Sequence, residues 1–167
     1  MAKVKETVWR DLTGQSDRWV RTLLLAVIVG RLSLMAVGLA VLLAFGEGAA
    51  DGFSGLTESL DLEWIFVSLL FSPTIESLGI RLVVWLLGSR AGWGWPVWAT
   101  ALSCALLAIP LHGLSPVSVA VAPFFALMAM IQHHWMEKGR GWTGFWLIVV
   151  IHVVANGAAI GAMILLG

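Results

Sequence analysis

Four side chains capable of acid–base or hydrogen-bonding chemistry lie inside segments that are otherwise suited to lipid. They are Glu76, His112, His152 and Asn156. A charged side chain at bilayer depth costs roughly 2.5–3.5 kcal/mol on insertion scales, so polar groups kept there usually mark a functional site. One carboxyl, two imidazoles and an amide together suit water-mediated hydrolysis with a general base.

The segment around Glu76 carries the most local information. Pro73 cannot donate a backbone hydrogen bond, so we expect it to kink or break the helix, with Ser72 as an N-cap. Glu76 would then lie near the positive end of a half-helix, which favours the carboxylate, whereas burial in lipid favours the neutral acid. Arg81 lies about 140° further around the helix, so a direct pair between Glu76 and Arg81 would be strained.

The remaining polar groups have both a functional and a structural interpretation. His152 and Asn156 are four residues apart and share one helix face, which can present an imidazole and an amide to one ligand atom. His112 follows Pro110 near the end of its apolar run. The structural alternative for each is an interhelical hydrogen bond, which membrane bundles use in packing. For Arg81 it is an ion pair, or a charge reaching the membrane edge.

Other polar residues give weaker signals. Arg31 is a charge within the first apolar run, and its candidate partners are Glu76 or a lipid phosphate. His133 and His134 are adjacent and point in different directions on a helix, so we expect interfacial side chains rather than joint ligands. Cys104 is the single cysteine, which excludes an internal disulfide framework.

The composition sets the fold class. Apolar residues make up 59% of the chain and charged residues 12%, and the mean hydropathy of +0.92 excludes an ordinary soluble domain. We predict an all-α, polytopic transmembrane bundle with membrane lipids as partners, no nucleic acid, and an oligomeric state that the sequence does not specify. Five apolar runs are long enough to be spanning helices. They are 20–45, 64–87, 95–113, 116–132 and 144–166.

Charged residues in the connecting segments set the expected orientation. The segment 46–63 holds five acidic residues and no Lys or Arg, whereas the basic residues outside the runs lie in the N-terminal segment, at Arg90, and at Lys138 and Arg140. The positive-inside rule places that basic side in the cytoplasm. We therefore predict a bacterial or archaeal inner-membrane protein with its N-terminus inside and its C-terminus outside. Residues 1–19 form a cytoplasmic or interfacial segment, and 20–167 form one bundle.

In chain order, these polar residues resemble the motifs of the CAAX-protease and bacteriocin-processing (CPBP, or Abi) family of intramembrane proteases. The family pattern begins with Glu-Glu-x-x-x-Arg on one helix. Glu76, Ser77 and Arg81 match it, with Ser77 where the second Glu is usual. The resemblance covers about residues 64–166.

The two later motifs of the family are Phe-x-x-x-His and His-x-x-x-Asn. Ala108 and His112 match the first of these, with Ala108 where Phe is usual, and His152 and Asn156 match the second in full. The resemblance implies a helical bundle in which the polar residues converge on a cavity and hydrolyse a peptide bond near the membrane.

The resemblance also implies roles for these residues. Glu76 would activate water, His112 would orient that water, and His152 and Asn156 would bind the oxyanion. Arg81 and Ser77 would be supporting residues. The cofactor is either none or zinc, since Glu76, His112 and His152 would be a legitimate set of zinc ligands.

The expected substrate is a membrane-associated protein with a membrane-proximal C-terminal tail, either of a sorting type presented from outside or a CAAX-like end. The sorting type is preferred because His112 lies toward the outer end of its run. Two alternatives stay open. The first is an inactive relative acting as a scaffold or immunity protein, favoured by Ser77 and Ala108. The second is a subunit whose His112 and His152 ligate haem or a chlorin.

Overall fold

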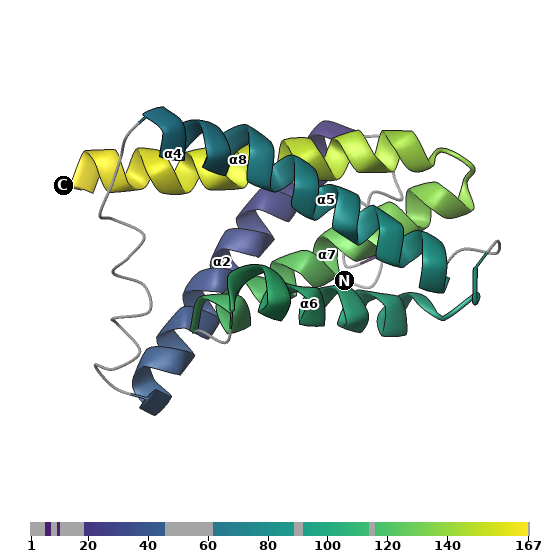
Figure 1. Ribbon diagram of the computed structural model, residues 1–167, viewed down its shortest axis with the longest axis horizontal. Coiled ribbons are helices and arrows are strands. Elements are labelled where there is room, and N and C mark those ends of the chain that lie inside the picture. The colour runs from purple at the N-terminus through teal and green to yellow at the C-terminus, as the bar shows by residue number, and fades with distance from the viewer. Residues whose placement is uncertain are drawn as a thin grey trace.

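The computed structural model describes residues 6–7, 10, 19–45, 62–88, 92–113 and 116–166, and every regular element in these ranges is helical (Figure 1). This confirms the all-α fold for the described part of the chain. The helices are α2 (Trp19–Phe45), α4 (Leu62–Phe66), the π-helical turn η1 (Val67–Phe71), α5 (Ser72–Val83), the π-helical turn η2 (Val84–Gly88), α6 (Val97–His112), α7 (Pro116–Glu137) and α8 (Gly141–Leu166).

Four helices of the described residues are long and apolar enough to cross a membrane, which indicates a membrane protein. They are Arg21–Ala40, Leu62–Gly88, Ser118–Glu137 and Gly141–Ala162. The predicted count of five is not confirmed, because α6 has only 16 residues. At about 1.5 Å per residue α6 is roughly 24 Å long, less than a hydrocarbon core of about 30 Å.

The second apolar run differs from the sequence expectation at Pro73. We expected a kink or a break there; helical structure continues from Leu62 to Gly88, so the chain does not break. The π-helical turn η1 directly precedes the proline, and the Ser72 amide donates to the Val67 carbonyl five residues earlier. The wider turn lets the chain pass the proline, whose ring lacks an N–H and would crowd a regular α-helical turn. Ser72 is therefore not an N-cap, and Glu76 lies inside a continuous helix.

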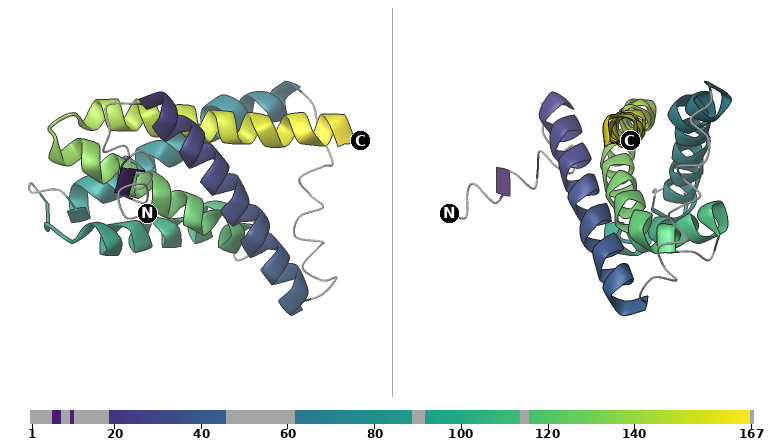
Figure 2. Two further views of the ribbon diagram at one scale, coloured as in Figure 1. Left: turned by 180° about the vertical axis from the view of Figure 1, so that it is seen from behind. Right: turned by 90° about the vertical axis from the view of Figure 1, so that its left-hand side faces the viewer.

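Helix α7 is the centre of the bundle and packs against α2, α5, α6 and α8. Figure 2 shows α2 on one side of α7 and α8, with α4 and α5 on the other side. The residues of α7 accordingly supply much of the apolar core, including Phe125, Met128 and Ile131, all almost fully buried. Many apolar side chains on the outer surface are exposed, as expected for helices that face lipid.

Basic side chains gather at the end of the bundle where α5 finishes and α7 turns into α8. The guanidinium carbon of Arg81 lies 4.2 Å from the ring centroid of Trp142. Arg140 and Lys138 lie 4.8 and 5.5 Å from the ring centroid of Trp135. We call this the basic end. Most of the predicted segment 1–19, the acidic segment up to residue 61, and Arg90 lie outside the described residues, so the orientation stays a prediction.

Candidate functional site

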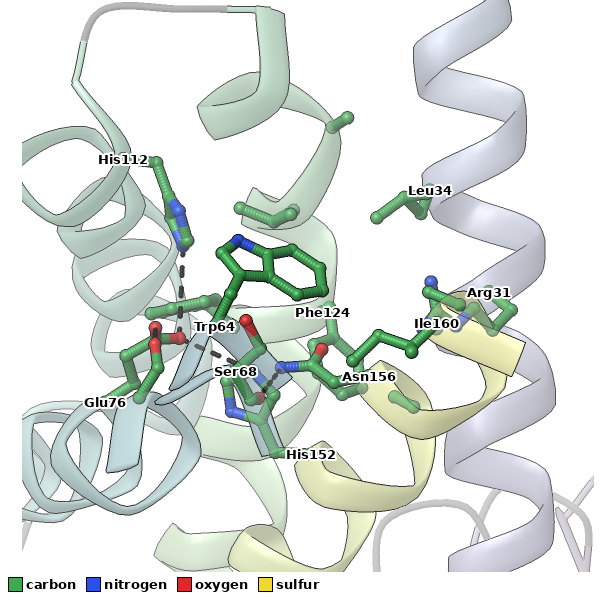
Figure 3. Close-up of a pocket in the computed structure, with 17 residues that line it drawn as sticks. Arg31, Leu34, Trp64, Ser68, Glu76, His112, Phe124, His152, Asn156 and Ile160 are labelled. Carbon is green, nitrogen blue, oxygen red and sulfur yellow. Dashed lines mark hydrogen bonds and ion pairs between the residues drawn. The ribbon is translucent and has the colours of Figure 1, made fainter. Parts of the chain in front are cut away.

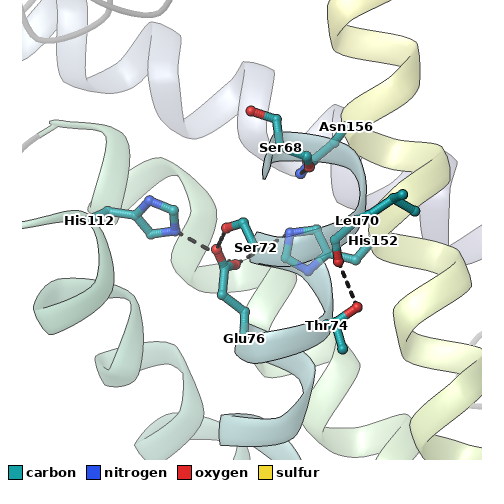
Figure 4. A network of polar contacts seen from close by, with 8 residues as sticks. All are labelled: Ser68, Leu70, Ser72, Thr74, Glu76, His112, His152 and Asn156. Carbon is teal, nitrogen blue, oxygen red and sulfur yellow. Dashed lines mark hydrogen bonds and ion pairs between the residues drawn. The ribbon is translucent and has the colours of Figure 1, made fainter. Parts of the chain in front are cut away.

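Glu76 lies at the centre of a polar cluster inside the bundle (Figure 4). Its Oε2 atom is 3.4 Å from Nε2 of His152 and 3.9 Å from Nε2 of His112. Its other carboxylate oxygen, Oε1, accepts a hydrogen bond from the hydroxyl of Ser72. The Glu76 side chain is only 7% exposed, so these groups replace the water that would otherwise solvate the carboxylate.

Three different helices supply the members of this cluster. Ser72 and Glu76 are four residues apart on α5, which places both side chains on one helix face. His152 lies on α8. His112 is the last residue of α6, and Gly113 follows it with a φ of 73°, a backbone conformation that favours glycine. The helix end thus holds His112 over the cluster, where its side chain is 29% exposed.

Two aromatic rings of α7 fix the orientation of the imidazoles. The rings of Phe124 and His152 meet edge to face with their centroids 5.4 Å apart. Phe125 packs edge to face against both His152 and His112, at centroid distances of 6.2 and 6.0 Å. Such contacts restrict ring rotation, so the imidazoles are held in position by the core.

Asn156 joins α8 to the π-helical turn η1. Its Nδ2 atom donates a 2.8 Å hydrogen bond to the backbone carbonyl of Ser68. That carbonyl has lost its usual partners, because the Ser72 amide bonds Val67 instead and Pro73 has no N–H. Asn156 therefore completes the hydrogen bonding of the turn that precedes Pro73, and its second amide hydrogen is left for another acceptor.

These polar groups border a cavity of about 340 Å³ (Figure 3). Its size is at the lower end of the range for ligand pockets. All five apolar segments contribute to its wall. The lining residues are Gly30, Arg31, Leu34, Trp64, Ser68, Ser72, Glu76, His112, Ala120, Val121, Phe124, Phe125, His152, Ala155, Asn156, Ala159 and Ile160.

The structure brings only some of the candidate residues from the sequence to the cavity. Glu76, His112, His152 and Asn156 line the cavity together. Ser77 is fully buried but is not part of the wall. Arg81, which the resemblance implies as a supporting residue, does not line the cavity and instead covers the Trp142 ring at the basic end.

Sequence reasoning missed Ser72 and Ser68 as partners of the site. Ser72 had a detectable signal, since it precedes Glu76 by one helical turn. Ser68 had none, because its backbone carbonyl rather than its side chain makes the contact. His133 was expected to be interfacial, but it is only 6% exposed and has Nδ1 3.8 Å from Glu137 Oε2.

Glu76, His112 and His152, which were suggested as zinc ligands, are not arranged as a metal site. Among the described residues, no group of three His, Cys, Asp or Glu side chains is arranged to hold a metal ion. Both imidazole Nε2 atoms are directed at one carboxylate oxygen of Glu76. We therefore assign no chemical step to a metal, and zinc dependence stays a prediction.

The arrangement can move a proton and stabilise a negative oxygen. A carboxylate shielded from bulk water can accept a proton from a bound water, and imidazole or amide N–H groups can donate to a developing oxyanion. No family model, curated protein or solved structure matches this chain. The chemistry of the site therefore has to be inferred from its residues and their geometry.

Proposed function

We propose that the protein is an intramembrane endopeptidase that hydrolyses a peptide bond in the C-terminal tail of a membrane-associated protein. One observation carries the proposal: Glu76 Oε2 faces Nε2 of both His152 and His112 in a cavity within an apolar bundle. The resemblance to the CPBP family supports the same reaction.

The reaction follows from the cavity residues. Glu76 takes a proton from a water molecule that His112 orients, and the resulting hydroxide oxygen bonds to the scissile carbonyl carbon. The carbonyl π electrons move to its oxygen, where His152 and Asn156 donate hydrogen bonds. As the tetrahedral intermediate collapses, the C–N bond breaks, its electron pair goes to nitrogen, and Glu76 returns the proton there. The products are a carboxylic acid and an amine.

Two observations favour an active protease over the alternatives. Ser77 and Ala108, the positions that depart from the family pattern, do not line the cavity, whereas Glu76 and the other proposed catalytic residues all do. A haem bound between His112 and His152 is disfavoured, because the Glu76 carboxylate occupies the space that both Nε2 atoms face.

The position of the cavity favours a tail that enters from the end opposite the basic end. Trp64, near the start of the helix Leu62–Gly88, and Ile160, in the last turns of α8, both line the cavity. If the basic end is cytoplasmic, as the positive-inside rule suggests, the tail arrives from outside. We therefore prefer a sorting-type substrate to a cytoplasmic CAAX end, in the inner membrane of a bacterium or archaeon.

The test is cleavage by the purified protein in proteoliposomes. Two substrate sets would be offered: single-span reporters with C-terminal tails presented from outside, and a farnesylated CAAX peptide. Glu76→Gln keeps the side-chain shape and removes the base, so we expect cleavage to fall by about 10²–10⁴-fold.

Cys104→Ala serves as the control, since Cys104 is buried outside the cavity. A parallel cleavage assay with a chelator tests whether the protein needs a metal. Activity that is lost on chelation and restored by zinc would identify a metalloprotease. Full activity of Glu76→Gln would end the protease assignment and leave the scaffold as the preferred function.

A further inference from the structure

Arg31 is a partly buried cation of the cavity wall, and no partner for it is found in the part of the chain that the structure describes. It lies on α2 and lines the cavity that contains Glu76 (Figure 3). Its Nε atom is buried, and no hydrogen bond to it is found among the described residues. An uncompensated guanidinium inside an apolar bundle is costly, so a partner is expected when the site is in use.

Glu76 does not serve as that partner. It is the one carboxylate among the described residues that line the cavity, and it is already engaged by Ser72, His152 and His112. No ion pair between Arg31 and Glu76 is present in the described structure. Figure 3 shows Arg31 across the cavity from Glu76, with Asn156 between them in that view. The cavity therefore has a catalytic side and a separate cationic side.

We infer that Arg31 binds the terminal α-carboxylate of a peptide substrate, and so selects tails that are cut close to a free C-terminus. This inference rests on the proposed protease function. A guanidinium matches a carboxylate with two parallel hydrogen bonds, whereas a single point charge does not. The wall beside Arg31 is apolar, with Leu34, Phe124 and Ile160, which suits apolar side chains at the end of the tail.

A lipid phosphate fits the position of Arg31 less well. Arg31 is near the middle of α2, roughly 18 Å along the axis from its first residue and roughly 21 Å from its last at 1.5 Å per residue. Phosphate groups lie outside a hydrocarbon core of about 30 Å. The size of the cavity, about 340 Å³, further limits the ligand to a short segment of chain.

The test is equilibrium binding of N-acetyl-leucyl-alanyl-leucine, as the free acid and as the C-terminal amide, to the full chain in mild detergent. We expect the acid to bind about tenfold or more tightly than the amide. Arg31→Gln should abolish this preference, and Arg31→Lys should retain part of it. Arg21→Gln, which removes an exposed arginine of the same helix outside the cavity, should leave the preference unchanged.

Equal binding of acid and amide by the natural protein, or an unchanged preference in Arg31→Gln, would overturn the inference. So would a phospholipid that co-purifies with the natural protein and is lost from Arg31→Gln. The same titrations on Glu76→Gln separate the two proposals, since they need no turnover. An acid preference that persists while Glu76→Gln cleaves normally would refute only the protease. Glu76-dependent cleavage without an acid preference would refute only the Arg31 site.

Discussion

The chemistry proposed for Glu76 depends on how its two carboxylate oxygens are occupied. One oxygen faces the imidazoles, and the other accepts a hydrogen bond from the Ser72 hydroxyl. The serine hydrogen bond fixes the carboxylate orientation so that Oε2 faces the imidazoles, where the proposed reaction requires the water. Ser72 is thus a positioning residue, which acts through Glu76 rather than on the substrate.

Ser72→Ala should therefore reduce cleavage by about tenfold, because it removes one hydrogen bond to a charged group. Ser77→Ala is a matched control on the same helix. The Ser77 hydroxyl is buried, makes no hydrogen bond among the described residues and does not line the cavity, so its removal should leave the rate close to normal. Initial rates in proteoliposomes compare the two. Equal rates for both variants would show that Ser72 does not position Glu76.

We expect Asn156 to contribute both to the stability of the fold and to the rate of cleavage. Asn156→Ala leaves the Ser68 carbonyl without its 2.8 Å hydrogen bond, so the free energy of unfolding should fall by about 1–3 kcal/mol. Cleavage should fall by about 10²–10³-fold as an oxyanion donor is lost. Reversible unfolding in mixed micelles and initial rates measure the two effects. Val154→Ala, a truncation at an exposed position of α8, is the control. Unchanged stability in Asn156→Ala would contradict the structural role.

Residue types and spacing were enough to identify the cavity-lining candidates, because a polar group at bilayer depth is rare and costly. They were not enough to place Arg81, since a long cationic side chain can extend toward either a carboxylate or an aromatic ring. The Asn156–Ser68 contact joins residues 88 positions apart through a backbone carbonyl. No local pattern in the sequence encodes such a contact.

At the scale of elements, the docking of α2 on α7 shapes the wall that carries Arg31. A Cβ atom at Gly30 would lie 2.5 Å from Cδ2 and 2.9 Å from Cε2 of Phe124. Glycine therefore permits the close approach of the two helices. Phe124 in turn packs against His152, so this approach connects α2 to the proposed catalytic residues.

Gly30→Ala should force Phe124 to move, and overpacking of this kind costs about 1–3 kcal/mol. We expect a lower free energy of unfolding and reduced cleavage, because Phe124 orients His152. Gly38→Ala is the control on the same helix, since nothing lies within 4 Å of its added methyl group. Unfolding in mixed micelles compares the variants. If Gly30→Ala is as stable as Gly38→Ala, the two helices are not held at this contact.

Hydrophobic run length predicted where the apolar helices lie, but it did not predict that α6, with 16 residues, is too short to count among the four candidate spans. It did not predict the shape of the helix around Pro73. A proline removes one donor, but whether the chain breaks or widens into a π-helical turn depends on whether another helix satisfies the freed carbonyl. Here Asn156 of α8 does so.

On the scale of the whole molecule, the two ends of the bundle differ in charge. Arg81, Lys138 and Arg140 lie at the basic end, near Trp142 and Trp135. The cavity is lined in part by Trp64 and Ile160, which are nearer the other end. If the basic end is cytoplasmic, the substrate tail and the exposed edge of His112 are both on the outer side. Topology therefore decides between a sorting-type tail and a cytoplasmic CAAX end.

Reporter fusions after Asp51, Gly94 and Gly139 test this orientation. We expect Gly94 and Gly139 to report the cytoplasm and Asp51 to report the outside, because Lys and Arg outside the apolar runs are confined to one side. The Gly94 fusion also tests α6, whose 16 residues span only if the bilayer thins locally or the helix ends lie in the interface. If the Asp51 and Gly139 fusions report the same side, the predicted topology is overturned. If the Gly94 and Gly139 fusions both report the outside, the orientation is the inverse of the predicted one, and a cytoplasmic tail becomes the favoured substrate.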